Sequence, residues 1–367
     1  MRMVINGLAA LQGGGQTYLR NILCHLPEDE DFHIKLLLSK PLSLPYDTRI
    51  DVMMLPMLAN PLVRAIWERS CLGSLLQQFR ADLLFCPSGI IPRTNQCPSV
   101  VVFRNMLPFD QNVVHRYPIG WVRIRLRILN YVLLESMKVA NGIIFLSHYA
   151  KDTIGRLLGV KMPKNVVIPH GVNERFRQQS GKVHSWMPNR YLAYVSILDV
   201  YKAQIEVVEA FAMLKRLNGY PGKLFLIGPE YAPYARRILE TISSYGLEQD
   251  VIIRAVPYEE LPSVYQHADV NIFASECENC PNILLEALAA GRPVVCSSRP
   301  PMPEFAGDAV TYFDPSRPEE LAVALQTVLN GDHEAAGQAA RRQSMLYDWR
   351  RSAEMTWKFL AEVAGKF

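Results

Sequence analysis

The chain has 367 residues, of which 49% are hydrophobic and 20% charged, and its net charge is +4. This composition is that of a folded globular protein with two or three domains, and it excludes a disordered chain. The mildly basic balance gives no reason to expect nucleic acid as a partner, but it fits an anionic substrate or an anionic membrane surface.

The start of the chain and its cysteines predict a cytoplasmic protein. The apolar stretch at the N-terminus is too short for a signal peptide, and a glycine soon interrupts it. The longest apolar region, 128–146, contains Glu135, Lys138 and Asn141, whereas a membrane-spanning helix needs about 20 nearly uncharged residues. The seven cysteines are therefore expected to be reduced thiols.

Strand-like apolar runs alternate with helix-length amphipathic runs along the chain, which predicts an α/β architecture with mainly parallel sheets. The strands expected in the first half are 3–6, 33–38, 83–86, 100–103, 142–146 and 166–168. Those expected in the second half are 191–196, 223–227, 251–254, 270–273, 293–296 and 310–312. Each half thus predicts one doubly wound, Rossmann-like unit.

A glycine-rich loop, Gly13-Gly14-Gly15, follows the first expected strand, and a helix is expected from about Thr17. Such a loop lies at the carboxyl end of a parallel sheet, where open α/β folds bind ligands. Glycine lets the backbone approach a ligand and exposes its amide hydrogens. The pattern is not G-x-G-x-x-G, so it predicts no nicotinamide site, and a plain turn explains it at least as well.

Two polar residues, Arg104 and Asn105, follow the strand expected at 100–103. The segment 121–129 (Trp121 to Leu129) carries three arginines among aliphatic residues: Arg123, Arg125 and Arg127. It predicts a helix, with Arg123 and Arg127 on one face. Contact with a membrane surface and an ordinary helix with solvated arginines are equally good interpretations.

A polar stretch without periodicity, 174–190, separates the two halves. We expect an N-terminal domain over 1–175 and a C-terminal domain over 188–347. The last residues, 348–367, predict a helix in which Trp349 and Trp357 share an apolar stripe.

Two cationic residues of the second half are candidates for binding a diphosphate. Lys202 follows the strand expected at 191–196 and precedes a helix expected over 205–217. A lysine at this place can reach a diphosphate at the carboxyl end of the sheet, although most lysines are merely solvated. Arg254 ends a later strand, where an arginine is usually only solvated.

The most informative pattern lies at 275–296. Glu278 is in a polar loop, Pro281 suits the first position of a helix, and Glu286 falls in the second turn of that helix. The amides at a helix start suit a phosphate, and carboxylates suit sugar hydroxyls. The other residues expected to bind a ligand here are Asn279, Cys280, Pro281, Asn282 and Ile283.

The same stretch contains a C-x2-C pair, Cys277 and Cys280. Such a pair can be half of a zinc or redox site, but the remaining cysteines supply no second pair with metal spacing. We therefore interpret the pair as two thiols in a substrate loop and expect no metal site.

The stretch 275–296 resembles the E-x7-E signature of retaining, nucleotide-sugar-dependent glycosyltransferases of the GT-B type (glycosyltransferase family 4, glycosyl transferases group 1). The glycine-rich first loop and the turn at Gly228 and Pro229 also resemble that family, so the likeness covers nearly the whole chain. It implies two facing Rossmann-like domains, with a last helix that crosses back to the first domain.

The resemblance also implies an activity. A hexosyltransferase-like enzyme would move a sugar from a nucleoside diphosphate to a hydroxyl of a glycan or lipid-linked acceptor, without a cofactor or bound metal. Lys202 would stabilise the leaving diphosphate, Glu278 would orient the sugar, and Glu286 would bind the ribose. The setting implied is surface polysaccharide synthesis at the inner face of the membrane.

Two departures from the family leave other functions open. The family usually has an arginine where this chain has Ile197, and the resemblance makes Arg254 a candidate to replace it at the diphosphate or to contact the base instead. The family usually has His-Asp where this chain has Arg104 and Asn105, and its His contacts the transferred sugar. In this chain Asn105 could still hydrogen-bond a sugar hydroxyl, and Arg104 could pair with an acidic sugar or a phosphate. A homologue that binds nucleotide sugars without transferring them is therefore a second hypothesis. A nucleotide-sugar 2-epimerase of the same architecture is a third, but it needs acid and base groups near the sugar C2, for which the sequence offers no convincing set. A membrane-surface interaction module is a fourth, and it rests only on 121–129.

Overall fold

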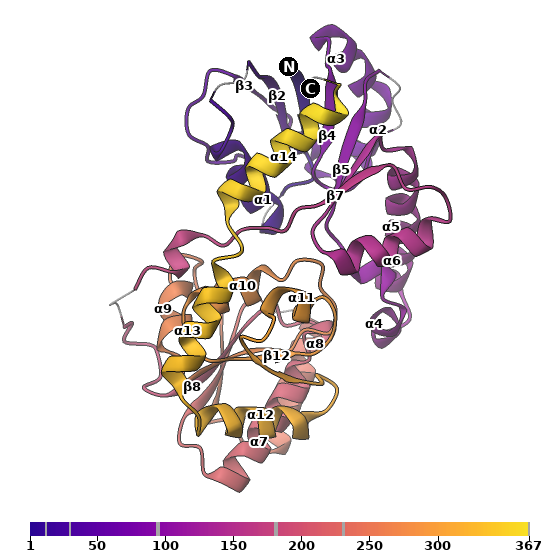
Figure 1. Ribbon diagram of the computed structural model, residues 1–367. Helices are drawn as coiled ribbons and strands as arrows, with labels where there is room; N and C mark the ends of the chain where they lie inside the picture. The colour runs from indigo at the N-terminus through magenta and orange to yellow at the C-terminus, as the bar shows by residue number, and fades with distance from the viewer. Residues whose placement is uncertain (12, 29–30, 93–95, 180–182, 230–231, 366–367) are drawn as a thin grey trace. The chain divides into compact units, whose positions relative to one another are not determined.

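The computed structural model describes residues 1–11, 13–28, 31–92, 96–179, 183–229 and 232–365. The chain divides into two compact units (Figure 1). Unit 1 comprises Met1–Phe109, Ile124–Gly171 and Asp348–Phe367, and unit 2 comprises Asp110–Arg123 and Val172–Tyr347. The main division falls close to the polar stretch expected to separate the halves, but the assignment of 110–123 to unit 2 was not expected.

Unit 1 is built on a seven-stranded sheet in the order β3-β2-β1-β4-β5-β6-β7. The strands are β1 (Arg2–Asn6), β2 (His33–Leu38), β3 (Ile50–Met54), β4 (Leu83–Cys86), β5 (Ser99–Phe103), β6 (Gly142–Phe145) and β7 (Lys164–Val167). Every described pairing is parallel. The chain thus starts at the middle of the sheet and winds outward in both directions, as in a Rossmann-like unit.

The edge strand β3 was not expected from the sequence. Four of its five residues are exposed, including Val52 and Met53. A strand with no buried face needs no alternation of apolar and polar residues, so the usual sequence signal is missing. Backbone pairing with β2 defines this strand.

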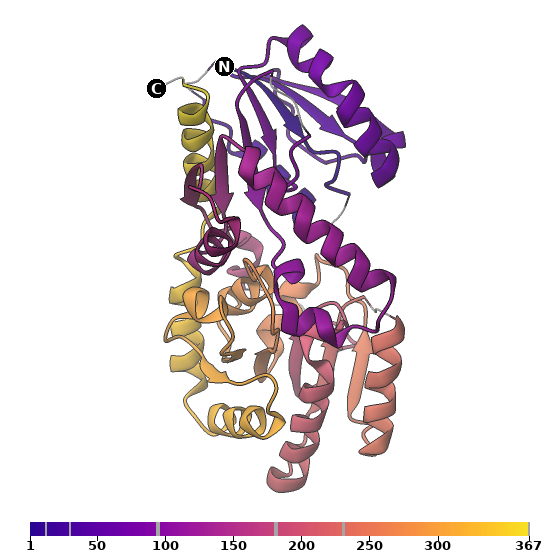
Figure 2. The ribbon, with the colours of Figure 1, turned by 90° about the vertical axis from the view of Figure 1, so that its right-hand side faces the viewer.

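The helices of unit 1 include the C-terminal one. They are α1 (Gly14–Cys24), η1 (Pro56–Ala59), α2 (Pro61–Ser70), α3 (Leu72–Phe79), η2 (Leu107–Phe109), most of α5 (Trp121–Val139), α6 (His148–Leu158) and α14 (Trp349–Val363). α14 packs beside α1 (Figures 1 and 2). Trp349 and Trp357 are both buried, and the Trp357 indole donates to the Ile22 carbonyl at 3.1 Å. The predicted return of the last helix to the first domain is confirmed.

Unit 2 is built on a six-stranded parallel sheet in the order β10-β9-β8-β11-β12-β13. The strands are β8 (Tyr191–Val195), β9 (Lys223–Ile227), β10 (Val251–Arg254), β11 (Val270–Phe273), β12 (Val294–Ser297) and β13 (Thr311–Phe313). The helices are α4 (Gln111–Arg116), η3 (Glu174–Phe176), η4 (Val200–Lys202), α7 (Gln204–Asn218), α8 (Ala232–Ser244), α9 (Leu261–His267), α10 (Asn282–Ala289), α11 (Met302–Ala306), α12 (Pro318–Leu329) and α13 (His333–Ser344).

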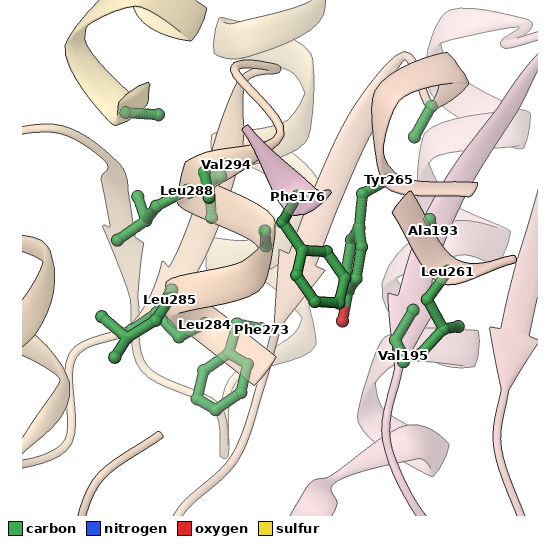
Figure 3. Packing of buried hydrophobic residues seen from close by; sticks show 14 of the residues in the cluster. Phe176, Ala193, Val195, Leu261, Tyr265, Phe273, Leu284, Leu285, Leu288 and Val294 are labelled. Atoms are coloured by element: carbon green, nitrogen blue, oxygen red, sulfur yellow. The ribbon is translucent and has the colours of Figure 1, made fainter. Parts of the chain in front are cut away.

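The core of unit 2 fixes the position of α10. Leu284, Leu285 and Leu288 of this helix are fully buried in a hydrophobic cluster (Figure 3). The same cluster contains the rings of Phe176 and Tyr265, which meet edge to face with centroids 5.9 Å apart. Burying one leucine contributes about 2 kcal/mol, so three of them hold the helix firmly and with it the polar residues at its start.

The longest helix, α5, has 19 residues and carries several charged side chains. Within the described part of the chain, none of the helices combines the length and the hydrophobicity that a membrane span requires.

Candidate functional site in unit 2

The two expected catalytic side chains meet at the carboxyl end of the unit 2 sheet. Lys202 follows β8 and Glu278 follows β11, and these two strands are neighbours. The strand order reverses between them, which makes this the switch point where open α/β sheets bind ligands. The Lys202 Nζ forms an ion pair with the Glu278 Oε1.

The Lys202 ammonium is buried and yet charged. Its side chain is 5% exposed, and Nζ lies 4.7 Å from the centroid of the Tyr201 ring. Burial is the largest single influence and would lower the pKa of Lys202, but the charge and hydrogen bond of Glu278, together with Tyr194 and Cys277, outweigh it, so the pKa is raised. The site therefore holds a charged ammonium, paired with the Glu278 carboxylate and with little water around it, where electrostatic interactions are strong.

Hydrogen bonds between side chains and the backbone fix the turn that carries Lys202. Asp199 caps η4 by accepting a hydrogen bond from the Val200 amide at 2.7 Å. The Tyr194 hydroxyl donates to the Lys202 carbonyl at 2.7 Å. Ala203 follows with a φ of 54°, a left-handed conformation that ends η4 and directs the chain into α7.

The loop between β11 and α10 is joined to this turn. The Glu276 amide donates to the Tyr201 carbonyl at 2.8 Å, and the Ser275 hydroxyl reaches the same carbonyl at 3.5 Å. Because these contacts lie within three residues of Glu278, they set the position of its carboxylate relative to Lys202.

Helix α10 begins one residue later than predicted. Pro281 is its cap residue and Asn282 its first helical residue; among the described residues, no side chain caps this end. Asn279 is buried, and Ile283 packs partly against the hydrophobic cluster. The helix start is suited to an anion through its backbone dipoles.

Among the described residues, the two cysteines of this loop take part in no disulfide. Cys277 is buried, and burial raises the pKa of its thiol. Cys280 is partly buried, with its Sγ 3.9 Å from the Asn282 Oδ1. The Cys277 thiol is therefore poorly suited to nucleophilic chemistry, which needs a thiolate.

Glu286 belongs to a second group of side chains. Its two carboxylate oxygens accept hydrogen bonds from Tyr258 at 3.0 Å and from Tyr265 at 3.3 Å. Burial raises the pKa of Glu286 to about 7, although both hydroxyls and the nearby Arg175 act in the opposite direction. Neither tyrosine was singled out from the sequence, because α9 and the loop before it carry no distinctive motif.

Arg254 and Gly228 lie at the ends of neighbouring strands. Arg254 is exposed, and its guanidinium lies 4.7 Å from the Trp186 ring centroid, a cation–π contact that leaves its N–H edge available. Gly228 has a φ of 149°, and a Cβ there would lie 2.1 Å from the Ser196 carbonyl oxygen. Glycine is therefore required at this turn. Ile197, at the position of the missing family arginine, is 39% exposed.

The glycine-rich loop of unit 1 is shorter than expected. α1 begins at Gly14, so Gly14 and Gly15 are helical and only Gly13 lies in the loop. Gly13 has a φ of 61°, which favours glycine. A Cβ at Gly15 would lie 3.3 Å from the Ala10 Cα, so the third glycine allows a close approach of backbone segments.

Arg104 and Asn105 are held by neighbours within unit 1. The Arg104 guanidinium lies 5.1 Å from the Tyr18 ring centroid. His170 lies 5.3 Å from the same ring and stacks on Trp349 at 5.1 Å, so Arg104 covers a buried aromatic group. The Asn105 Oδ1 accepts a hydrogen bond from the Leu107 amide at 3.1 Å. This bond leaves the side-chain amide nitrogen of Asn105, rather than its oxygen, as the group suited to a hydroxyl.

Two parallel, doubly wound units define the GT-B class of folds. Two family models of such proteins match consecutive parts of this chain. Glycosyltransferase Family 4 matches 12–176, and Glycosyl transferases group 1 matches 175–343. Together they span nearly the whole chain, which belongs to this family of GT-B glycosyltransferases.

Individual relatives agree with this family. Sulfoquinovosyl transferase SQD2 of Arabidopsis thaliana is 32% identical over 304 residues, 76% of this chain and 56% of that protein. The O-antigen chain mannosyltransferase B of Escherichia coli is 24% identical over 245 residues, 63% of each. The chain thus spans less than two thirds of the length of these relatives. The crystal structure of Anabaena HepE in complex with UDP and glucose has the same fold, with a TM-score of 0.71 at 16% identity over 98% of this chain and 99% of that one.

Proposed function

We propose that the protein is a glycosyltransferase that moves a sugar from a nucleoside diphosphate to a hydroxyl group. The observation that carries the proposal is the buried Lys202–Glu278 pair at the switch point of the unit 2 sheet. Membership of the family supports transfer of a sugar, and the UDP and glucose bound to HepE support a nucleotide-sugar donor.

The chemical problem is the negative charge that grows on the leaving diphosphate. The Lys202 ammonium and the backbone amides at the start of α10 would stabilise this charge, and one such preorganised donor is worth about 3–4 kcal/mol. Glu278 would hold hydroxyls of the transferred sugar. Glu286 would bind the ribose, and the loop residues between the two glutamates would surround the donor.

We further propose retention of configuration without a bound metal. The acceptor hydroxyl would attack the anomeric carbon from the side of the leaving group, so a new C–O bond forms where the bond to phosphate breaks. The hydroxyl proton would pass to a diphosphate oxygen, so no protein base is needed. The positive charge that a metal would supply comes from Lys202 and the helix amides instead.

Unit 1 is proposed to bind the acceptor, a glycan or a lipid-linked glycan. Arg104 suits an acidic sugar or a phosphate, and the Asn105 amide suits a hydroxyl. The O-antigen mannosyltransferase among the relatives supports a role in surface polysaccharide synthesis.

The exposed side of α5 supports peripheral contact with an anionic membrane. Four large apolar residues follow each other at helical spacing and are 48–71% exposed: Trp121, Ile124, Ile128 and Tyr131. Arg125 and Arg127 are also exposed. Apolar side chains with adjacent arginines and terminal aromatic rings suit the interface of an anionic bilayer. Arg123, by contrast, is turned inward and donates to two carbonyls of its own segment.

The first test is a panel of UDP-, GDP- and ADP-sugars scored by thermal shift and by turnover. A ligand at 100 times its dissociation constant stabilises a protein by about 2.7 kcal/mol, so a true donor gives a clear shift. Binding without hydrolysis or transfer would favour the impaired homologue suggested by Ile197 and Arg104. Release of a C2 epimer would favour the epimerase.

The second test removes the paired charges. Lys202→Ala and Glu278→Ala should each lower kcat by about 100- to 1000-fold, because each loses a group that acts on the transition state. Lys161→Ala and Glu240→Ala, at exposed positions, serve as controls. Near wild-type transfer by both site variants would refute the proposed site.

The membrane contact is tested by sedimentation with phosphatidylglycerol–phosphatidylcholine vesicles. The double variant Ile124→Ser/Ile128→Ser should lose binding, while Leu239→Ser, an equally exposed residue of α8, should retain it. Equal sedimentation of the double variant and the wild type would exclude α5 as the contact.

A further inference from the structure

A short segment from the first half of the chain is part of unit 2. This inserted segment, Asp110–Arg123, contains α4 and contacts η4, the turn that ends at Lys202. It is closed on itself: Arg123 donates to the carbonyls of Tyr117 at 2.7 Å and His115 at 2.6 Å. The segment is therefore a preformed turn that presents the end of α4 to the rest of unit 2.

Arg116, at the end of α4, joins two acidic side chains. Its Nη2 lies 2.9 Å from the Glu206 Oε1, and its Nη1 pairs with the Glu276 Oε2. The Glu206 and Glu276 side chains are only 20% and 12% exposed, so solvent screens these pairs less than surface pairs. Removing the guanidinium would leave two poorly solvated carboxylates facing each other.

These two carboxylates lie on the segments that carry the proposed catalytic pair. Glu206 is in the first turn of α7, four residues after Lys202. Glu276 is two residues before Glu278 in the loop that follows β11. A single guanidinium thus links both segments.

Tyr117 makes a second link to the same turn. Its hydroxyl donates to the Asp199 Oδ1 at 3.0 Å, and this oxygen also caps η4 through the Val200 amide. Burial and the charge of Asp199 raise the pKa of Tyr117, so the hydroxyl keeps its proton and remains a donor.

We propose that Arg116 and Tyr117 are positioning residues, which hold Lys202 and Glu278 in register for transfer. The inference rests on the proposed function of that pair. Neither residue need touch the substrate; each fixes a segment on which a catalytic side chain stands. Misplacement of a reacting group by about 1 Å lowers rates by about 100-fold, so small shifts of these segments matter.

The test compares kinetics of Arg116→Met, Arg116→Lys and Tyr117→Phe with the wild type. The substrate is whichever of the UDP-, GDP- and ADP-sugars the wild type turns over. Arg116→Met should lower kcat by about 10- to 100-fold, with KM for the donor changed by less than about threefold. Arg116→Lys should restore part of the loss, because it keeps the charge but not the forked geometry. Tyr117→Phe should cost about fivefold.

A second arm distinguishes positioning from an independent role. In a Lys202→Ala background, Arg116→Met should lower kcat by much less than in the wild type, because one of the two groups that it holds in register is already absent. Equal losses in both backgrounds, or no loss in either, would overturn the inference. Arg236→Met, the same change at an exposed arginine of α8, is the matched control.

Melting temperatures verify that the variants fold. If Arg116→Met does not fold, Tyr117→Phe, which removes one oxygen atom, decides the question in both backgrounds. If the wild type turns over a donor and the variants are equally active, the positioning role is contradicted but the proposed function is not. No turnover of any donor by the wild type contradicts the proposed function, and this inference with it.

Discussion

Glu286 is a buried carboxyl group whose proton affinity depends on folding. Its pKa rises from 4.5 to about 7 because burial disfavours the charged form. Between these two values the folded state binds a proton that the unfolded state has released. The contribution of Glu286 to stability is therefore fully present below about pH 4.5 and is lost as the pH rises through about 7.

This linkage predicts how Glu286→Gln behaves. The amide cannot titrate, so the variant should gain stability relative to the wild type, by up to about 3 kcal/mol, as the pH rises from about 5 to about 8. Urea denaturation across this range measures the difference. Glu240→Gln, at an exposed site of α8, should show no such trend. A constant difference between Glu286→Gln and the wild type would mean that Glu286 is ionised throughout.

At the residue scale, the sequence predicted that Lys202 and Glu278 belong to one site, but not which residues surround them. The spacing of two glutamates around a helix start is a local pattern, and so it can be read from sequence. The partners of Glu286, Tyr258 and Tyr265, lie more than 20 residues away along the chain. Contacts of this kind depend on packing, for which no local pattern exists.

At the scale of elements, replacing two helical glycines by alanine should change the stability of the protein in opposite directions. Alanine is favoured over glycine in a helix by about 1 kcal/mol. At Gly337 in α13, however, a Cβ would lie 2.2 Å from the Gly291 carbonyl oxygen, which is backbone and cannot move aside easily. At Gly155 in α6, the obstacle is the end of the flexible Met162 side chain, at 2.7 Å.

We therefore expect Gly337→Ala to destabilise the protein by about 2 kcal/mol, because overpacking outweighs helix propensity. Gly155→Ala should be neutral or should stabilise the protein by up to about 1 kcal/mol. Chemical denaturation of both variants gives the comparison. If the free energy of unfolding changed with the same sign at both positions, the room available for a Cβ would not explain the effects.

Element boundaries were predictable where a buried face imposed a pattern. The strands expected near β8, β9 and β11 were found within a residue of their expected bounds, since each is fully or almost fully buried. β3 was missed because it is exposed. The early start of α1 was missed because glycine is a poor helix former, and its tertiary context overrode this preference.

At the scale of the whole molecule, the C-terminal helix is structurally part of unit 1. Trp357 is 1% exposed, and the Phe32 ring lies tilted beside it with ring centroids 5.3 Å apart. Trp357→Ala should destabilise unit 1 by about 3–5 kcal/mol, because it creates a large cavity. Trp121→Ala, at a residue 71% exposed, should change stability by less than about 0.5 kcal/mol.

Hydrogen–deuterium exchange locates this effect. In Trp357→Ala, exchange should quicken in peptides from β1, β2 and α1, far from position 357 in sequence. Faster exchange confined to the last 20 residues would mean that α14 does not stabilise the rest of unit 1.

The two units were foreseeable from alternating strands and helices, since each sheet needs helices to cover it. The place of 110–123 was not foreseeable. Its membership of unit 2 depends on contacts such as Arg116 with Glu206, which join residues 90 positions apart.

The way the backbone passes between the units has a practical consequence for protein engineering. The polypeptide changes unit at 109/110, 123/124, 171/172 and 347/348, so neither unit is one continuous piece. A chimera that exchanges the first 171 residues for those of a homologue would also import a foreign version of the inserted segment. Grafts that replace unit 1 should therefore retain the native 110–123 together with the recipient's unit 2.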